Sequence, residues 1–285
     1  MDHWKLRTRQ LRFGPIPLVM GILNVTPDSF SDGGRFAGPT AAVDAALRME
    51  DAGAAILDIG GESTRPYSQP VSPDEQRRRV MPVIERLATR LRIPISIDTC
   101  SAAVASDAIA GGAEIINDIS GLRFDPEMLP LARRSGAGVC VMHIQGTPQT
   151  MQDDPHYEDV VSEVDAYLRE TLAGCLAEGL ERQRICLDPG VGFGKTHAHN
   201  LALLRGVRRF LEIGQPLLIG HSRKGFIAHV LGDKTLDRTA GSVGVSLAMA
   251  AAGVPLLRVH DVAETCQALR LFEAAGGCEA AVGGG

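Results

Sequence analysis

Short hydrophobic segments recur at regular intervals along the whole chain. Each is almost continuous in Val, Ile and Leu and lacks the alternation of polar and apolar residues that a half-exposed strand shows. Short continuous runs of this kind are typical of parallel strands that are buried on both faces. The pattern predicts eight strands: Leu18–Asn24, Ala54–Gly60, Pro94–Thr99, Glu114–Ser120, Gly138–His143, Ile185–Gly190, Pro216–Ser222 and Leu256–Asp261.

Amphipathic segments with a helical period lie between these strands. The clearest are Thr40–Ala52 and Asp74–Leu91, and the second follows Ser72, a suitable cap, and Pro73, which suits the first helical turn. Three more show the same period: Asp159–Glu178, Leu201–Glu212 and Val262–Ala275. Glycines precede most strands, where helix ends favour them: Gly53, Gly112, Gly136, Gly179, Gly214 and Gly253.

This repeated strand, helix and glycine unit predicts an α/β fold, a single-domain (β/α)₈ TIM barrel. A doubly wound open sheet is the alternative, and eight strands favour closure. Within this organisation we expect an N-terminal extension at residues 1–17, the barrel at 18–275 and a flexible tail rich in Gly and Ala at 276–285.

Composition narrows the function classes. The chain has 285 residues, of which 45% are hydrophobic and 22% charged, as in an ordinary globular protein. A net charge of −5 and an aromatic content of 4% argue against a dedicated nucleic-acid-binding protein. The six cysteines are scattered without a C-x-x-C, and the sequence has neither a signal-peptide core nor an apolar run of membrane length. We therefore expect a cytoplasmic protein with reduced thiols.

All eight predicted strands end in polar or charged side chains, and barrels of this class carry their active sites at that end. Asp98, Asn117 and Asp188 offer acceptors and an amide, which suit a flat heterocycle with several N–H groups. Four others offer cationic donors that suit a phosphate or carboxylate: Arg65, Lys224, Arg258 and His260. Any one of the strand-end residues could be a simple helix cap, but together they predict a site for a heterocycle that carries a diphosphate.

Two long connections, residues 24–36 and 61–72, follow strand ends of this predicted site and are rich in Gly, Pro, Ser and Asp. We interpret them as lids that exclude water, although ordinary surface loops have a similar composition. The segment 190–196, GVGFGKT, lacks the spacing of a phosphate-binding P-loop. His197 and His199 have no third ligand nearby at metal-binding spacing.

Eight segments of the chain resemble dihydropteroate synthase of the folate pathway, in that family's order and spacing. They read MGILNVTPDSFSDGG, LDIGGESTRP, SIDT, INDISG, VMHIQGTPQTMQ, LDPGVGFGKT, SRKGFI and RVHDV, and the resemblance extends from Met20 to about Ala268. The resemblance implies a TIM barrel, a homodimer and a requirement for Mg²⁺. It also implies condensation of 6-hydroxymethyl-7,8-dihydropterin diphosphate with p-aminobenzoate, by an SN1-like route through a pterin–CH₂ cation.

The resemblance assigns roles residue by residue. Four side chains match the pterin-binding set: Asp98, Asn117, Asp188 and Lys224. Three match the diphosphate contacts: Thr64, Arg258 and His260. Asn24 matches the Mg²⁺ contact, Phe193 and the stem of Lys224 would flank the aminobenzoate ring, and Asp32 matches an acid of the first loop. The catalytic set implied is Asp32, Arg65, Lys224, Arg258 and His260.

One departure from the family pattern bears on the second substrate. Gly225 follows Lys224 where the family often has a serine that can contact the aminobenzoate carboxylate, so we expect activity with weaker aminobenzoate affinity. Two alternatives remain open. A pterin-binding methyltransferase barrel would share the fold, but it binds no diphosphate and would not need the cations of SRK and RVHDV. A non-catalytic paralogue would be expected to lack some of the polar residues named above.

Overall fold

A computed structural model of the chain describes residues 1–26, 31–32, 35–36, 39–64 and 67–278. Its central element is an eight-stranded parallel sheet with the strand order β10-β9-β8-β7-β6-β3-β12-β11. The strands are β3 (Leu18–Asn24), β6 (Ile56–Gly60), β7 (Ile95–Asp98), β8 (Ile115–Asp118), β9 (Gly138–Met142), β10 (Ile185–Asp188), β11 (Leu218–Ile219) and β12 (Leu256–Val259). Each lies within one of the eight predicted segments.

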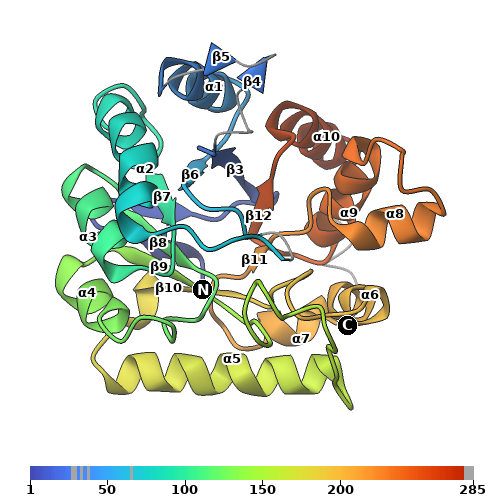
Figure 1. Cartoon of the computed structure of the whole chain (residues 1–285). Helices are drawn as coiled ribbons and strands as arrows, with labels where there is room; N and C mark the ends of the chain where they lie inside the picture. Colours follow the sequence, from blue (N-terminus) through green and yellow to red (C-terminus); the bar gives the residue numbers. More distant parts are fainter. Residues whose placement is uncertain (27–30, 33–34, 37–38, 65–66, 279–285) are drawn as a thin grey trace.

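The two outer strands of this order meet, so the sheet is a closed barrel. Leu187 of β10 forms a parallel bridge with Leu217, beside β11, and its N–H donates to the carbonyl of Pro216 at 2.9 Å. The helices surround the strands as an outer ring (Figure 1). The predicted TIM barrel is therefore confirmed, and the open-sheet alternative is wrong.

The outer ring contains the five predicted helices and further ones that the sequence analysis did not delimit. The helices are α1 (Pro39–Asp51), α2 (Pro73–Leu87), α3 (Ala102–Ala110), α4 (Met128–Ser135), α5 (Val160–Ala177), α6 (His197–Arg205), α7 (Val207–Leu211), α8 (Gly225–Leu231), α9 (Thr239–Ala251) and α10 (Val262–Ala274), with a 3₁₀ turn at Arg182–Arg184. Ser72 caps α2 by accepting from the N–H of Glu75, and Pro73 is the first residue of that helix, as predicted.

Two predicted helices have different bounds in the structure. The segment Leu201–Glu212 is divided into α6 and α7 at Gly206, where a Cβ atom would lie 3.0 Å from Val161 of α5, and Thr196 caps the helix earlier than expected. The helix predicted at Asp74–Leu91 already ends at Leu87. The six glycines before strands all have positive φ, which confirms that they end helices in a conformation that other residues rarely adopt.

The N-terminal segment closes the lower end of the barrel. Its strands β1 (His3–Lys5) and β2 (Gln10–Arg12) pair antiparallel. Trp4 and Leu6 are fully buried against the inward side chains at the starts of the strands, which are Met20, Ile56, Ile115, Cys140, Cys186, Leu218 and Leu256. The two cysteines are thus core residues. The predicted extension is a plug that excludes water from this end.

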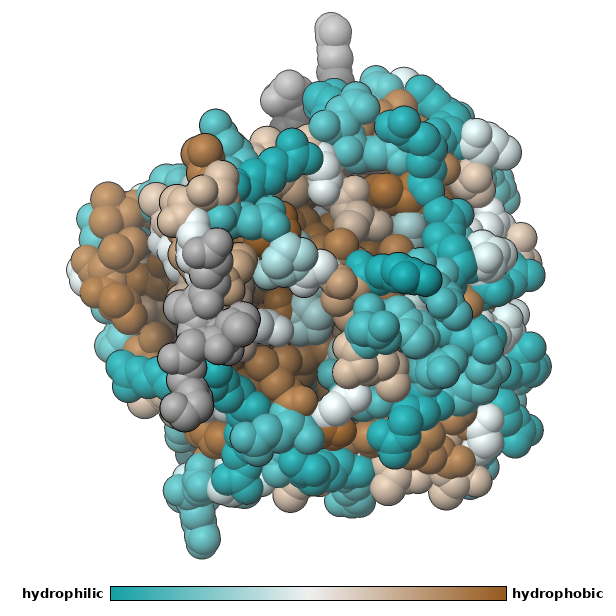
Figure 2. All heavy atoms as spheres, turned by 180° about the vertical axis from the view of Figure 1, so that it is seen from behind, coloured by the Kyte–Doolittle hydropathy of each residue, from teal (hydrophilic) through white to brown (hydrophobic). Residues whose placement is uncertain are grey.

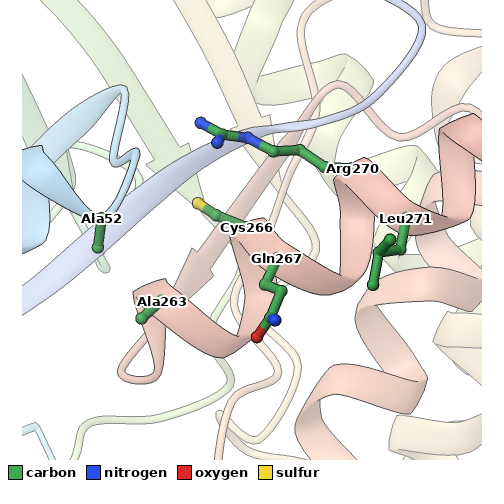
Figure 3. A pocket seen from close by; sticks show the side chains of 6 residues that line it. All are labelled: Ala52, Ala263, Cys266, Gln267, Arg270 and Leu271. Carbon is green, nitrogen blue, oxygen red and sulfur yellow. The ribbon is translucent and has the colours of Figure 1, made fainter.

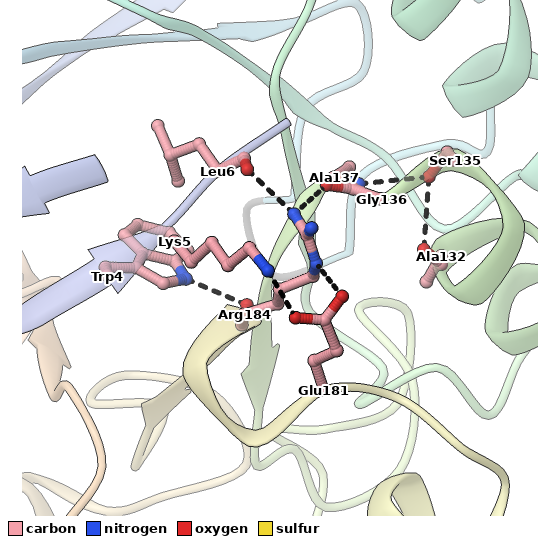
Figure 4. Close-up of polar contacts among 9 residues, drawn as sticks. All are labelled: Trp4, Lys5, Leu6, Ala132, Ser135, Gly136, Ala137, Glu181 and Arg184. Carbon is pink, nitrogen blue, oxygen red and sulfur yellow. Dashed lines mark hydrogen bonds and ion pairs between the residues drawn. The ribbon is translucent and has the colours of Figure 1, made fainter. Parts of the chain in front are cut away.

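Polar contacts hold the plug in place (Figure 4). The indole N–H of Trp4 donates to the carbonyl of Arg184 at 2.8 Å, and the Arg184 guanidinium donates to the carbonyl of Leu6 at 2.7 Å. Glu181 accepts from both Lys5, at 2.6 Å, and Arg184, at 3.1 Å. These bonds join the plug to the 3₁₀ turn before β10 and to Glu181, and so hold it against the lower end of the barrel.

The face of the molecule that Figure 2 shows is largely hydrophilic, with hydrophobic patches between the hydrophilic side chains. Large side chains more than 45% exposed include Val230, Leu231 and Leu236 at the end of α8 and just beyond it. Among the helices that the structure describes, none is long and apolar enough to cross a membrane. A short hairpin of β4 (Ser31–Asp32) and β5 (Arg35–Phe36) lies in the first long loop, over α1 in Figure 1.

Candidate functional site

The inner face of the barrel changes from apolar to polar toward the C-terminal ends of the strands. In a strand, residues two apart point to the same face. Four strands carry a polar residue two positions after the apolar residue that packs near the N-terminal plug. These are Asp58 after Ile56, Asn117 after Ile115, Asp188 after Cys186 and Arg258 after Leu256. Asp98 ends β7 in register with Asn117. The strand periodicity therefore gathers these side chains inside the upper half of the barrel.

Arg258 links two carboxylates at the centre of this group. Its Nε donates to Oδ2 of Asp58 at 2.7 Å, and its Nη2 donates to Oδ2 of Asp98 at 2.6 Å. Asp58 also accepts from Nδ2 of Asn117 at 3.0 Å. All four side chains are more than four-fifths buried. The structure thus brings together three of the predicted residues, Asp98, Asn117 and Arg258, through one that had been given no role, Asp58.

Burial shifts the titration of these groups. It raises the pKa of Asp98 to about 7, while the nearby Arg258 acts to lower it and Asp58 raises it further. Burial also raises the pKa of Asp188, against the effect of the Gly190 N–H, which donates to its Oδ1 at 2.7 Å, and of Lys224. For Arg258, burial acts to lower the pKa, but Asp58 and Asp98 raise it above its ordinary value. Arg258 therefore stays charged.

Lys224 reaches the same region from the segment after β11. Its Nζ donates to the carbonyl of Val191 and lies 4.3 Å from the ring centre of Phe193, a cation–π contact. Burial lowers the pKa of Lys224 to about 7, and Asp188 opposes this shift. Phe193 is 9% exposed and packs on Ile119 and other apolar side chains. The predicted pair of Phe193 and Lys224 is thus in contact, which places a cation and an aromatic face side by side.

The glycine-rich segment that carries Phe193 does not form a phosphate-binding loop. Its glycines have positive φ, and a Cβ at Gly190 would lie 1.9 Å from the carbonyl oxygen of His143. The glycines allow the loop to pack tightly on the segment after β9. Lys195, which is 2% exposed, anchors the loop by donating to the carbonyl of Phe193 at 2.8 Å, and its Nζ lies 2.9 Å from Nδ1 of His143.

The charge state of His260 differs from the prediction. Its Nδ1 lies 3.1 Å from the hydroxyl of Ser222. Burial lowers the pKa of His260 to about 4, and the guanidinium groups of Arg258 and Arg223 lower it further. From its residue type, His260 was predicted to be one of the cations of the site. The structure corrects this, because the imidazole is neutral near pH 7 and offers only hydrogen bonds.

A cavity of about 210 Å³ opens beside Asp98. Its walls come from the segments after β6, β7, β8 and β9, and Thr64 is among them. Two of these segments are joined, since the N–H of Tyr67 donates to the carbonyl of Pro148 at 3.1 Å and Gln149 donates to the carbonyl of Ser68 at 3.2 Å. The second long loop is therefore held against the loop after β9 and covers one side of the cavity.

Asn24 ends β3 beside Gly60 and Asp98, and its amide oxygen is a type of ligand that fits a magnesium ion. A Cβ on Gly60 would lie 3.6 Å from Oδ1 of Asn24 and 3.7 Å from Oδ2 of Asp98, so both oxygens point toward this glycine. Among the described residues there is no group of three or more His, Cys, Asp and Glu side chains that could hold a metal. An ion here would have few protein ligands, as Mg²⁺ accepts when phosphate oxygens and water complete its shell.

Two predicted residues are not placed. Arg65 lies outside the described residues, and for Asp32 only the backbone, in β4, is described.

A second cavity of about 330 Å³ lies in the helical layer, between α10 and the end of α1 (Figure 3). It is lined by Ala52, Ala263, Cys266, Gln267, Arg270 and Leu271. None of the predicted site residues lines it. The predicted chemistry is thus concentrated at the strand ends and not in this larger hollow.

Sequence reasoning left three buried polar residues near the site without a role. They are Asp58, His143 and Lys195. Asp58 could have been assigned from the period of two in its strand, because it shares the inward face with Ile56. The contact between His143 and Lys195 joins residues 52 positions apart, and no local pattern reports it.

Comparison with known proteins agrees with this geometry. The family model described as pterin binding enzyme matches residues 20–260. The dihydropteroate synthase of Escherichia coli K12 is 46% identical over 258 residues, which cover 90% of this chain and 91% of that protein. A structure of Xanthomonas albilineans dihydropteroate synthase with 4-aminobenzoic acid superimposes with a TM-score of 0.90 at 44% identity, covering 96% of this chain and 98% of the other.

A second structure of the Xanthomonas albilineans enzyme, in complex with 7,8-dihydropteroate, superimposes with a TM-score of 0.87 at 42% identity. It covers 96% of this chain and 98% of the other.

Proposed function

Since this chain belongs to the dihydropteroate synthase family of pterin-binding enzymes, and is thus a transferase, we propose that it condenses 6-hydroxymethyl-7,8-dihydropterin diphosphate with p-aminobenzoate. The products are 7,8-dihydropteroate and pyrophosphate. The observation that carries the proposal is the group of buried polar side chains inside the barrel, where carboxylates and an amide lie beside one arginine and one lysine.

The acceptors of this group suit the pterin. Asp98, Asn117 and Asp188 can accept from the N–H groups along one edge of the ring, with Asp188 facing the 2-amino and N3 edge. Lys224 donates to ring acceptors. Its contact with Phe193 also supports a flat aminobenzoate ring between the Phe193 face and the lysine stem. The pocket would therefore select a heterocycle by its pattern of donors and acceptors.

The diphosphate end would lie toward Thr64, Arg258 and His260. Arg258 keeps its charge, and neutral His260 can donate one hydrogen bond to a phosphate oxygen. Asn24 would hold Mg²⁺, which when bound supplies positive charge to the diphosphate oxygens. Arg65 and Asp32, in the two long loops, complete the proposed catalytic set.

The reaction we propose is SN1-like. The bond between the pterin CH₂ and the diphosphate oxygen breaks first, and the electron pair leaves with pyrophosphate. The positive charge on CH₂ is delocalised into the ring, near the carboxylates of Asp98 and Asp188. The neutral aromatic amine then forms the C–N bond and releases a proton, so that no activated serine or cysteine is needed. The loops must exclude water, which would otherwise trap the cation.

The proposal is tested by mixing the protein with pterin diphosphate, p-aminobenzoate and Mg²⁺ and measuring pyrophosphate. We expect release that depends on p-aminobenzoate, together with formation of dihydropteroate. If no pyrophosphate appears, or if its release ignores p-aminobenzoate, the synthase assignment is wrong. A methyltransferase barrel would instead bind a pterin without needing the diphosphate, and a non-catalytic paralogue would bind without turnover.

A homodimer is part of the same proposal. It is supported by the exposed hydrophobic side chains Val230, Leu231 and Leu236, since exposed apolar patches often mark protein–protein interfaces. Light scattering of the purified protein should give twice the chain mass of 30.3 kDa, and a value equal to one chain would contradict the dimer.

A further inference from the structure

Asp58 occupies a central position under the candidate site without being one of the predicted substrate contacts. It lies on β6, and its side chain is fully buried inside the barrel. One oxygen, Oδ2, accepts both from Nδ2 of Asn117, on β8, and from Nε of Arg258, on β12. A single atom therefore joins a residue proposed to bind the pterin with a residue proposed to bind the diphosphate.

The bond to Asn117 determines which end of the amide faces the substrate. A carboxylate oxygen can only accept, so the Asn117 atom that contacts Asp58 must be the NH₂ group. The carbonyl oxygen of Asn117 is then the end left for the pocket. With Asp98 and Asp188, this makes the ring-binding surface one of acceptors, and it requires a ligand edge that carries N–H groups.

The bond to Arg258 orients the guanidinium. The group is planar, so donating from Nε to Asp58 and from Nη2 to Asp98 fixes its plane and its rotation. In the part of the chain that the structure describes, Nη1 of Arg258 has no hydrogen-bond partner. Its two N–H groups, together with the second N–H of Nη2, remain to donate to an anionic ligand.

Asp58 has no polar contact among the described residues other than these two. The second oxygen of Asp58, Oδ1, is buried and has no hydrogen-bond partner among the described residues. The same holds for the hydroxyl of Ser96 on β7, the residue that is paired with Asp58 in the strand register. A carboxylate that only braced the barrel would be expected to satisfy both oxygens with the scaffold. Among the described residues, Asp58 instead forms its hydrogen bonds only with two site residues, Asn117 and Arg258.

We propose that Asp58 is a positioning residue that sets Asn117 to accept from the pterin and Arg258 to donate to the diphosphate. The inference rests on the proposed function and deepens it, because it couples recognition of the ring to that of the leaving group. Asp58 acts through its two partners and does not touch the substrate.

The first test measures binding of 6-hydroxymethylpterin, which lacks the diphosphate, by calorimetry. We expect Asp58→Ala to weaken binding by about tenfold or more, because the Asn117 amide is free to turn. In an Asn117→Ala background, the same substitution should change the affinity less than about twofold, since the group through which Asp58 acts is gone. Asp58→Asn should recover most of the affinity, because its carbonyl oxygen can accept both bonds.

The second test separates the kinetic constants. Asp58→Ala should raise KM for the pterin diphosphate and lower kcat through Arg258, while KM for p-aminobenzoate stays the same. The matched control is Asp165→Ala, which removes a buried carboxylate of α5 that pairs with Arg169 and Arg209, outside the site, and has one unpartnered oxygen as Asp58 does. It should lower the melting temperature without changing pterin affinity. If Asp58→Ala does not fold, Asp58→Leu, which fills the same space without an acceptor, is measured instead, and the same losses are expected.

Either of two results would overturn the inference: wild-type pterin affinity in the Asp58 variants, or an equal loss with and without Asn117. Both apply when the wild-type protein binds pterin and releases pyrophosphate. A wild-type protein that binds no pterin refutes the inference together with the proposed function. One that binds pterin but makes no dihydropteroate refutes only the proposed reaction, and the calorimetric comparison still decides the role of Asp58.

Discussion

Replacing Arg258 by methionine should destabilise the protein as well as inactivate it. The substitution keeps an apolar stem but leaves the carboxylates of Asp58 and Asp98 without their cation, 0% and 8% exposed respectively. Removing one partner of a buried ion pair costs about 3–5 kcal/mol, because the remaining charge is not solvated. We therefore expect a loss of about 3 kcal/mol or more in the free energy of unfolding at about pH 8.

The loss should be smaller in acid. Arg258 acts to lower the pKa of Asp98, which is about 7 in the folded protein, so removing it raises that pKa further above the unfolded value of about 3.9. A group with a raised folded pKa stabilises the fold below its unfolded pKa and loses that contribution as pH rises through the folded value. A rise of about one pKa unit in the variant adds about 1 kcal/mol to its deficit between about pH 6 and about pH 8, out of about 1.4 kcal/mol over the whole titration.

The measurement is urea unfolding followed by circular dichroism at the two pH values, for wild type and Arg258→Met. A turnover assay at a temperature where both are folded should show kcat reduced by about 10²–10³-fold, as expected for loss of a donor to the leaving group. A difference in unfolding free energy below about 1 kcal/mol, or one that does not grow with pH, would refute the reasoning about buried charge.

Three further predictions follow from other parts of the molecule. Trp4→Ala should lower the free energy of unfolding by about 3–5 kcal/mol, because it leaves a cavity where the fully buried indole fills the lower end of the barrel. The control Leu271→Ala, at a 64% exposed position, should change the free energy of unfolding by less than about 0.5 kcal/mol. Equal losses in a urea titration would contradict the role of Trp4 as a plug. The pH profile of kcat/KM for the pterin diphosphate should be bell-shaped around about pH 7, because the rate rises as Asp98 loses its proton and falls as Lys224 loses its proton. Lys224→Gln should remove the alkaline limb of the profile. An unchanged alkaline limb in that variant would show that another group causes the fall. Gly225→Ser should lower KM for p-aminobenzoate by up to about tenfold, because the serine hydroxyl adds a donor for the carboxylate of the substrate. The position has room for the side chain, since a Cβ there meets only the edge of His197 at 3.4 Å. An unchanged KM would count against a contact between this hydroxyl and the carboxylate.

The fold was largely readable from local patterns. Each buried parallel strand is a short apolar run, and most helices before a strand end in a glycine whose positive φ other residues avoid, so neither feature depends on distant contacts. The division of the helix at Gly206 was missed because the close packing there, on Val161 of α5, involves a residue 45 positions away. The N-terminal plug was missed for the same reason, as the partners of Trp4 belong to the barrel interior.

Six predicted site residues could be assigned to one end of the barrel from the order of residues alone, because parallel strands all present their C-terminal ends to the same side. They are Asp98, Asn117, Asp188, Lys224, Arg258 and His260. How these side chains act on one another depends on the folded arrangement. Asp58 and Arg258 are 200 positions apart, yet their hydrogen bond orients the guanidinium of the arginine. Burial and neighbouring cations leave His260 neutral where its residue type alone suggested a positive charge. Hydrogen bonds and desolvation depend on distances across the barrel, and a linear pattern carries no information about them.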